Sequence, residues 1–349
     1  MINRLSKNEA LKLLVSANLK DVGIAALEAK RTLHSDRVTT FVIDRNINYT
    51  NICHIGCKFC AFHTNLGQAD GYILPYETID KKIEELLAIG GTQILFQGGV
   101  HPKLAIDYYE NLVDHIHVKF PTIDIHGFSA VEIAYIAKIS HITTSAVLAR
   151  LQERGMASMP GAGAEILSDR VRAYTSPNKV SAAEWLRIHG EAHKLGMTTS
   201  ATMVFGFGET DEEIVEHFEQ LRQLQDETGG FTAFILWSYQ PDRTELQRLR
   251  PDLTRQSSNC YLRLLALSRL YLDNFQNVQS SWVTQGSYIG QLALKFGAND
   301  LGSTMMEENV VAATGCSHSM VTDEMVALIR GAGEIPAQRN TRYKILRRF

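Results

Sequence analysis

This chain of 349 residues lacks the features that define several classes of protein. It has no apolar run of membrane-spanning length and no apolar N-terminal stretch before a small-residue cleavage site, so we expect a cytoplasmic protein that is not bound to a membrane. Its formal net charge of -3 gives no broad basic field that would attract nucleic acid. With 45% hydrophobic residues, it can bury a sizeable core.

Cysteine is also scarce, and its placement is uneven. Of the 5 cysteines, Cys53, Cys57 and Cys60 lie close together, whereas Cys260 and Cys316 have no cysteine neighbour. In a reducing cytosol, such a group is more typical of metal binding or catalysis than of disulfides. Iron-sulfur clusters with four irons usually take four cysteines, so a local triplet leaves one iron open for another ligand. An open iron is a place where chemistry can occur.

Short apolar runs alternate with amphipathic helical segments along most of the chain. Capping boxes, in which Glu follows three residues after Ser or Thr, mark helix starts at Ser6, Ser181 and Thr210. The repetition favours an α/β fold, a (β/α)8 TIM-type barrel, over a doubly wound open sheet that alternates in the same way. The predicted parallel strands are 46–51, 93–99, 123–129, 157–163, 198–206, 231–239, 278–286 and 298–304.

The segments outside these strands predict three parts. We expect an N-terminal helical segment over 1–40, the barrel over 41–320, and a C-terminal helical extension packed on the barrel over 321–349. No linker rich in Pro, Gly or Ser separates them. The flanking helices should therefore cap or cover the barrel.

Polar residues and glycines end several predicted strands, where the active site of a barrel lies. Gln97-Gly98-Gly99 lets a ligand approach the backbone, although paired glycines also close ordinary turns. Glu165 can accept hydrogen bonds from ribose hydroxyls or simply favour a helix N-terminus. His126, inside a strand, is more typical of a core group. Further candidates for substrate contact are Ser129, Thr202, Gln240, Thr284, Gln285, Asn299 and Asp300.

The spacing Cys-x3-Cys-x2-Cys, with Phe59 before the last cysteine, resembles the cluster loop of the radical S-adenosylmethionine superfamily. The resemblance implies a four-iron four-sulfur (4Fe-4S) cluster on Cys53, Cys57 and Cys60. It also implies S-adenosyl-L-methionine as the ligand of the open iron. The residues that it implies for cofactor binding are Phe59, Gln97, Gly98, Gly99, Ser129 and Glu165.

Two other interpretations of the cysteine triplet stay open. A zinc site of Cys3His type could use His54 or His63 as its fourth ligand, because zinc is usually tetrahedral with sulfur and nitrogen ligands. An electron-transfer ferredoxin would need a fourth cysteine, and neither Cys260 nor Cys316 has a local partner.

Longer runs resemble the menaquinone-pathway and deazaflavin-forming branch of the superfamily. The runs 46–53, 90–99 and 161–167 carry this likeness, and the runs 226–235, 281–286 and 296–309 resemble dehypoxanthine futalosine cyclases, also called cyclic dehypoxanthinyl futalosine synthases. One departure is Leu236, where the family has proline. The aminofutalosine synthases and the deazaflavin-forming synthases share the cluster loop and the barrel. The choice among these families therefore rests on the C-terminal runs.

This resemblance implies a radical cyclisation in the futalosine route to menaquinone. A 5'-deoxyadenosyl radical would abstract the C4' hydrogen of dehypoxanthine futalosine, and the substrate radical would add to its benzoate ring. An external donor such as flavodoxin or ferredoxin would supply the electron. Glu165 and Asp300 are the first candidates for the base of the final deprotonation.

Overall fold

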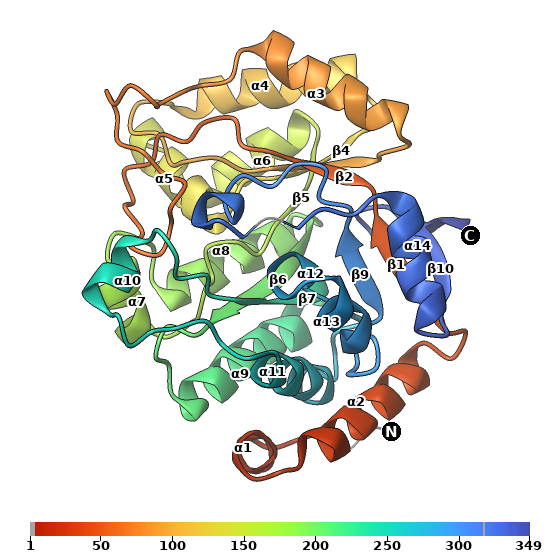
Figure 1. Cartoon of the computed structure of the whole chain (residues 1–349). Helices are drawn as coiled ribbons and strands as arrows, with labels where there is room; N and C mark the ends of the chain where they lie inside the picture. Colours follow the sequence, from red (N-terminus) through yellow and green to blue (C-terminus); the bar gives the residue numbers. More distant parts are fainter. Residues whose placement is uncertain (1–3, 317) are drawn as a thin grey trace.

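The computed structural model describes residues 4–316 and 318–349; residues 1–3 of the predicted N-terminal segment lie outside the described residues. Its strands form one sheet at the centre of the molecule, with helices around it (Figure 1). The strands are β1 (Val38–Val42), β2 (Asp44–Ile47), β3 (Gln93–Phe96), β4 (Asp124–Gly127), β5 (Met156–Met159), β6 (Thr198–Phe205), β7 (Phe231–Ser238), β8 (Asn277–Gln279), β9 (Asp300–Ser303), β10 (Ile335–Arg339) and β11 (Ile345–Arg348).

The sheet curls back on itself. Its strand order is β11-β10-β1-β9-β8-β7-β6-β5-β4-β3-β2, so β1 and β2 lie far apart in the order although Ile43 alone separates them in the chain. The pairings from β2 through β9 to β1 are parallel. The predicted barrel architecture with flanking helices is therefore confirmed in the form of a half-barrel, with β11 and β2 as its edge strands, and the doubly wound open sheet is wrong.

Amphipathic helices cover the outer face of the curled sheet (Figure 1). Both reciprocal hydrogen bonds of the predicted capping boxes form at Ser6 and Thr210, whereas at Ser181 only the bond that its hydroxyl accepts from the Glu184 amide forms. The helices are α1 (Lys7–Val15), α2 (Leu19–Leu33), α3 (Tyr76–Ala88), α4 (Ile106–Lys119), α5 (Ala130–Ser140), α6 (Thr144–Glu153), α7 (Asp169–Thr175), α8 (Ala182–Lys194), α9 (Asp211–Thr228), α10 (Glu245–Leu249), α11 (Ser258–Tyr271), α12 (Trp282–Gln285), α13 (Ser287–Ala293), η1 (Ala312–Thr314) and α14 (Thr322–Gly331).

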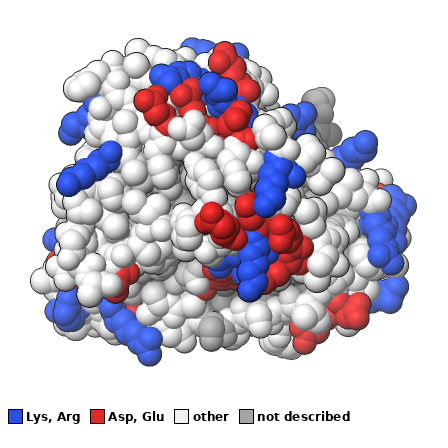
Figure 2. Space-filling model, turned by 90° about the horizontal axis from the view of Figure 1, so that it is seen from above, with Lys and Arg blue, Asp and Glu red and all other residues white. Residues whose placement is uncertain are grey.

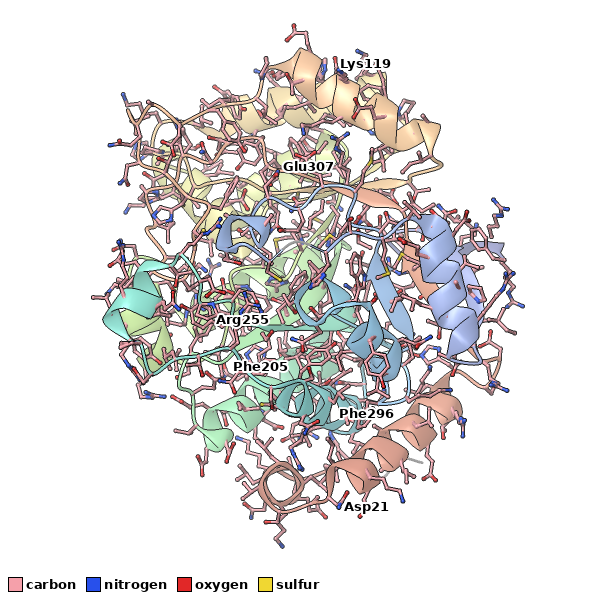
Figure 3. The ribbon with its side chains drawn as sticks, viewed as in Figure 1. Asp21, Lys119, Phe205, Arg255, Phe296 and Glu307 are labelled. Atoms are coloured by element: carbon pink, nitrogen blue, oxygen red, sulfur yellow. The ribbon has the colours of Figure 1, made fainter. Side chains whose placement is uncertain are left out.

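The N-terminal helices pack on the outer layer of the barrel. Helix α1 contacts α9, and α2 contacts α11. A Cβ at Gly23 of α2 would lie 2.6 Å from the ring of Phe296, which Figure 3 labels beside this helix. Glycine therefore lets α2 approach the barrel closely.

The C-terminal segment differs from its prediction. It is helical over α14, but β10 and β11 follow in place of further helix. Strand β10 pairs with β1 in parallel, from Val38 opposite Ile335 to Phe41 opposite Gln338, and β11 returns antiparallel. Pro336 does not fit a helix interior, and pairing with β1 satisfies backbone groups that a short isolated helix would leave open.

Charge on the surface is mixed in sign. On the face drawn in Figure 2, acidic and basic side chains are interspersed. Ion pairs of the protein include Lys119 with Asp80 at 2.8 Å and Arg45 with Glu85 at 2.7 Å. Among the described helices, none has the length and apolar character needed to cross a membrane.

Candidate active site

The three clustered cysteines lie on the loop that follows β2. Cys57 is buried with Ile55, Val100 and Val131, and Cys53 and Cys60 pack against this small cluster. Gly56 has a φ of 63°, a left-handed conformation that suits glycine and allows the tight turn between the first two cysteines. The loop thus gathers all three thiols in one partly enclosed place.

Burial affects all three thiols. Desolvation raises the pKa of Cys57 to about 12 and also raises the pKa of Cys53 and Cys60. In such surroundings a thiolate is stable chiefly when a metal replaces its proton. The donor set therefore fits an iron-sulfur cluster, which takes up deprotonated sulfur.

The two histidines considered for a zinc site have other contacts. His54 Nδ1 lies 3.0 Å from the carbonyl oxygen of Val100, and its ring packs on Tyr135 with centroids 3.9 Å apart. His63 Nδ1 lies 3.0 Å from the carbonyl oxygen of Cys60. Within the described residues, no three side chains of His, Cys, Asp or Glu are arranged to hold a single metal ion.

The glycine turn after β3 lies directly against the cluster loop. The amide of Gly99 donates to the carbonyl of Thr50 at 2.7 Å, and a Cβ at Gly99 would lie 2.3 Å from the carbonyl oxygen of Ile52. A Cβ at Gly98 would lie 2.7 Å from the ring of Tyr49. Only glycines allow this approach, so the turn can present its backbone to a ligand.

Glu165 lies on the loop after β5. Its carboxylate is in contact with Lys179, a lysine that sequence reasoning did not identify. The Lys179 ammonium also lies 4.9 Å from the centre of the Phe59 ring. Burial disfavours the charge of the Lys179 ammonium. Electrostatic attraction to Cys57 and Glu165 outweighs this effect and raises the pKa of Lys179 above its usual value. This pair places a fixed cation and anion beside the cluster loop.

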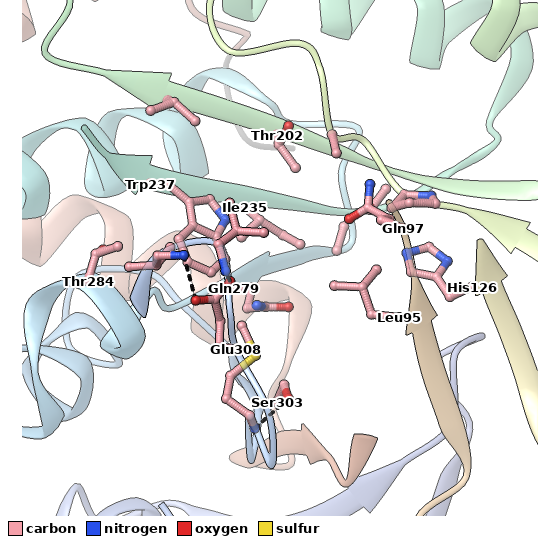
Figure 4. A pocket seen from close by; sticks show the side chains of 18 of the residues that line it. Leu95, Gln97, His126, Thr202, Ile235, Trp237, Gln279, Thr284, Ser303 and Glu308 are labelled. Atoms are coloured by element: carbon pink, nitrogen blue, oxygen red, sulfur yellow. Dashed lines mark hydrogen bonds between the residues drawn. The ribbon is translucent and has the colours of Figure 1, made fainter. Parts of the chain in front are cut away.

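A cavity of about 350 Å³ occupies the inside of the barrel. Figure 4 shows Trp237, Gln279 and Glu308 on one side of it, facing Leu95, Gln97 and His126. The predicted residues that line the cavity are Phe59, Cys60, Gln97, Glu165, Thr202, Gln240 and Thr284. These residues come from six separate segments, namely four loops, β6 and α12, which the fold brings together.

Several predicted site residues do not line this cavity, among them Ser129, Asp300, and Cys53, Cys57, Gly98 and Gly99 of the two loops described above. Ser129 caps α5, and its hydroxyl donates to Glu132 at 2.7 Å. Asp300 is fully buried and accepts two hydrogen bonds from Arg339, at 2.6 and 3.0 Å. The structure thus gives both side chains structural partners, and it brings neither Asn299 nor Gln285 to the cavity lining.

Two buried ionisable groups, Asp44 and His126, also line the cavity. Asp44 accepts hydrogen bonds from Ser303 and from Gln93, and burial raises its pKa to about 6. His126 bonds Ser158 at 2.6 Å, and burial lowers its pKa to about 3, so the ring is neutral at physiological pH. His126 is thus a satisfied group, as predicted, although one side of it lines the cavity.

Sequence reasoning missed Lys179, Asp44 and Glu132. Lys179 and Asp44 lie in no motif, because only folding brings them to the site. Glu132 had a signal, since Ser129-Ala-Val-Glu132 is a capping-box pattern next to the predicted β4 end.

Family models match both parts of the chain. Residues 47–221 match the radical SAM superfamily, and residues 228–348 match the C-terminal region described as CofH/MqnC. The chain belongs to the radical S-adenosylmethionine superfamily. It is therefore an enzyme of that superfamily, whose members use a 4Fe-4S cluster and S-adenosylmethionine.

Curated relatives indicate which members of the superfamily this chain is similar to. The chain is 47% identical to cyclic dehypoxanthine futalosine synthase of Halalkalibacterium halodurans, covering 99% of this chain and 92% of the relative. It is 41% identical to the protein of the same name from Streptomyces coelicolor, covering 98% and 86%. Aminodeoxyfutalosine synthase of Thermus thermophilus is 36% identical, covering 99% and 93%.

Solved structures that share the fold of this radical SAM enzyme have low sequence identity to it. Methylornithine synthase superposes with a TM-score of 0.75 at 16% identity, covering 96% of this chain and 95% of the other. This likeness supports the barrel architecture and carries no argument about the substrate.

Proposed function

We propose that the enzyme converts dehypoxanthine futalosine to its cyclic product in the futalosine route to menaquinone. The observation that carries the proposal is the 47% identity to a cyclic dehypoxanthine futalosine synthase along 99% of the chain. The C-terminal match over residues 228–348 supports it, because this part includes β7, α12 and the segment before η1 that border the cavity.

The cysteine loop, the glycine turn and Glu165 fit the two groups that the superfamily uses. Cys53, Cys57 and Cys60 would hold three irons of the cluster, and the fourth iron would take the methionyl end of S-adenosylmethionine. When bound, these groups supply the 5'-deoxyadenosyl radical that abstracts a hydrogen atom. The carbonyl oxygens of the glycine turn would accept hydrogen bonds from the methionyl ammonium, and Glu165 would accept hydrogen bonds from the ribose.

The work left to the protein is positioning and exclusion of water. The cavity would hold the substrate so that one hydrogen faces the cofactor, since a misplaced hydrogen or a competing donor would divert the reaction. Trp237 and Ile235 give one wall an apolar surface suited to an aromatic ring, while Gln279 offers amide groups to polar parts of the substrate. An external flavodoxin or ferredoxin would supply the electron.

A second candidate function is that of aminodeoxyfutalosine synthase. The relative with that name matches nearly the whole chain at 36% identity, compared with 47% for the cyclase. Relatives that transfer a 4-hydroxyphenyl group to 5-amino-6-(D-ribitylamino)uracil match at a similar level, 38% for the one from Methanosarcina barkeri. The higher identity favours the cyclase.

The test is a product assay under anaerobic conditions. Protein reconstituted with iron and sulfide should be mixed with S-adenosylmethionine, a reductant and dehypoxanthine futalosine, and products identified by mass spectrometry. We expect 5'-deoxyadenosine, methionine and the cyclic product. Formation of 5'-deoxyadenosine without the cyclic product, or turnover only of the aminodeoxyfutalosine synthase substrate, would overturn the assignment.

A further inference from the structure

In the glycine turn after β3, some backbone groups have a hydrogen-bond partner and others do not. The carbonyl of Gln97 accepts from Asn48 Nδ2 at 3.0 Å, and the amide of Gly99 donates to Thr50 at 2.7 Å. The carbonyl oxygens of Gly98 and Gly99, by contrast, receive no hydrogen bond from any described residue. Because the N–H and C=O of a peptide unit point in opposite directions, the bond from Gly99 to Thr50 turns the Gly98 carbonyl away from the cluster-loop root.

One buried carboxylate holds this turn. Glu132, in the first turn of α5, has 2% of its surface exposed. Its Oε1 accepts from the amide of Gly98 at 3.1 Å and from the hydroxyl of Tyr49 at 2.7 Å. Its Oε2 accepts from the amide and the hydroxyl of Ser129, at 2.6 and 2.7 Å.

The four donors come from three different places in the barrel. Tyr49 follows β2 and leads into the cluster loop, Gly98 follows β3, and Ser129 begins α5 after β4. A capping box needs only the contacts to Ser129. The two bonds made by Oε1 therefore serve another purpose, which is to join the root of the cluster loop to the glycine turn.

The ring of Tyr49 completes this arrangement. It packs against Gly98 so closely that a Cβ there would lie 2.7 Å from its ring atoms. Tyr49 also packs on Phe96 and Phe128, with ring centroids 5.4 and 5.8 Å apart. The Gly98 backbone is thus fixed on one side by an aromatic ring and at its amide by a carboxylate.

We propose that Glu132 is a positioning residue for the methionyl end of the sulfonium cofactor. Glu132 holds the peptide unit of residues 97–98 through the Gly98 amide, and Thr50 holds the next unit through the Gly99 amide. With the peptide units on both sides of the Gly98 Cα held, the free Gly98 carbonyl keeps one direction, so that this oxygen accepts from the ammonium group when the cofactor binds. The proposal rests on membership of the superfamily and on the cofactor part of the proposed function, and it does not depend on which substrate is cyclised.

The test compares Glu132→Gln with the wild type after anaerobic cluster reconstitution. The amide keeps the size of the side chain but replaces one acceptor oxygen with a donor, so it cannot satisfy all four donors. Equilibrium dialysis should measure binding of S-adenosylmethionine and of 5'-deoxyadenosine, which lacks the amino-acid part. Iron and sulfide content, thermal unfolding, and the electron paramagnetic resonance spectrum of the reduced cluster complete the set.

We expect Glu132→Gln to raise the Kd for S-adenosylmethionine at least tenfold, on the order expected for a misplaced hydrogen bond to a charged group. Binding of 5'-deoxyadenosine and the iron content should stay near wild type. The spectral change that S-adenosylmethionine causes in the reduced cluster should weaken. A merely structural defect would lower binding of both ligands together.

A matched control exists on α1. Glu9 occupies the same position of a capping box as Glu132, but it is exposed and lies outside the site. Glu9→Gln should leave the Kd for both ligands unchanged. If Glu132→Gln does not fold, Tyr49→Phe carries the test, because it removes one hydrogen bond to Oε1 and keeps the ring against Gly98.

For Tyr49→Phe we expect a Kd for S-adenosylmethionine raised by roughly threefold to tenfold, with 5'-deoxyadenosine binding unchanged. Unchanged S-adenosylmethionine binding in a folded Glu132→Gln variant, or an equal loss for both ligands, would overturn the proposal. The substrate of the cyclase appears in none of these measurements. Failure of the substrate assignment would therefore leave this result unaffected.

Discussion

Replacing Asp44 by asparagine should raise the free energy of unfolding, and this gain should appear only as the pH rises toward and above the pKa of Asp44. Asp44 lines the cavity and is buried, with 4% of its surface exposed. Desolvation raises its pKa from 3.8 to about 6, against the opposing effects of Ser303, Arg339 and Gln93. A buried carboxylate of this kind costs free energy whenever it is ionised.

The size and sign of the effect follow from linkage. The protonated carboxyl contributes stability that is fully present below pH 3.8 and is lost as pH rises through about 6. The difference between these two pKa values corresponds to roughly 3 kcal/mol of unfolding free energy. The asparagine variant does not ionise, so its gain over wild type should be near zero around pH 4 and approach that value around pH 8.

The hydrogen bonds allow this substitution. Ser303 can still donate to the new amide oxygen, and Gln93 can rotate its own amide so that its oxygen accepts from the new N–H group. No described residue donates to Gln93 Oε1, which leaves this oxygen available. The change therefore keeps both contacts of Asp44.

Urea unfolding of the cluster-free protein, in reducing buffer at several pH values, provides the measurement. Asp107→Asn is the control, because the Asp107 side chain is 84% exposed and should change stability little at any pH. A gain that does not vary with pH would show that the burial of charge is not the cause. An asparagine variant less stable than wild type at high pH would refute the reasoning altogether.

Further predictions concern the cluster, the glycine turn and the ion pair between Arg339 and Asp300. Cys57→Ser should lose most bound iron and sulfide after reconstitution, whereas Cys260→Ser should keep wild-type amounts; equal iron in both would contradict the ligand assignment. Gly99→Ala should lower unfolding free energy by about 1–3 kcal/mol or more and impair S-adenosylmethionine binding, because the new methyl group meets backbone atoms that cannot move aside. Arg339→Met should lower the unfolding free energy by about 3–5 kcal/mol, because it leaves Asp300 buried without its partner. Adding Asp300→Asn to this variant should restore much of the loss, as measured by urea unfolding. No recovery would argue against the ion pair as the cause.

Local patterns in the sequence were sufficient for much of the fold. Each predicted strand overlaps an observed one, because runs buried on both faces are apolar whatever their neighbours are. The largest errors occur where a partner distant in the chain decides the structure. Residues 282–285 form α12 instead of continuing a strand, and β10 forms only because the edge of β1 is available for pairing.

The candidate site shows the same division. The cysteine loop and the glycine turn are contiguous motifs whose chemistry depends on local spacing, so the sequence could indicate them. Ser129 and Asp300 were chosen for their places at strand ends, and such a place does not reveal whether a side chain already has a partner. Arg339 of β10 is the partner of Asp300 and lies far from it in the chain, whereas Glu132 is the partner of Ser129 within the same capping box.

By itself, the sequence determined the presence of a three-cysteine loop, an alternating α/β chain and a superfamily resemblance, since all of these depend on residues near one another in the chain. Only the tertiary structure decided which polar groups face the cavity, which are occupied by buried partners, and how Glu132 joins the cluster-loop root to the glycine turn. The physical reason is that hydrogen-bond satisfaction and desolvation depend on distances between residues far apart in sequence, and folding alone sets those distances.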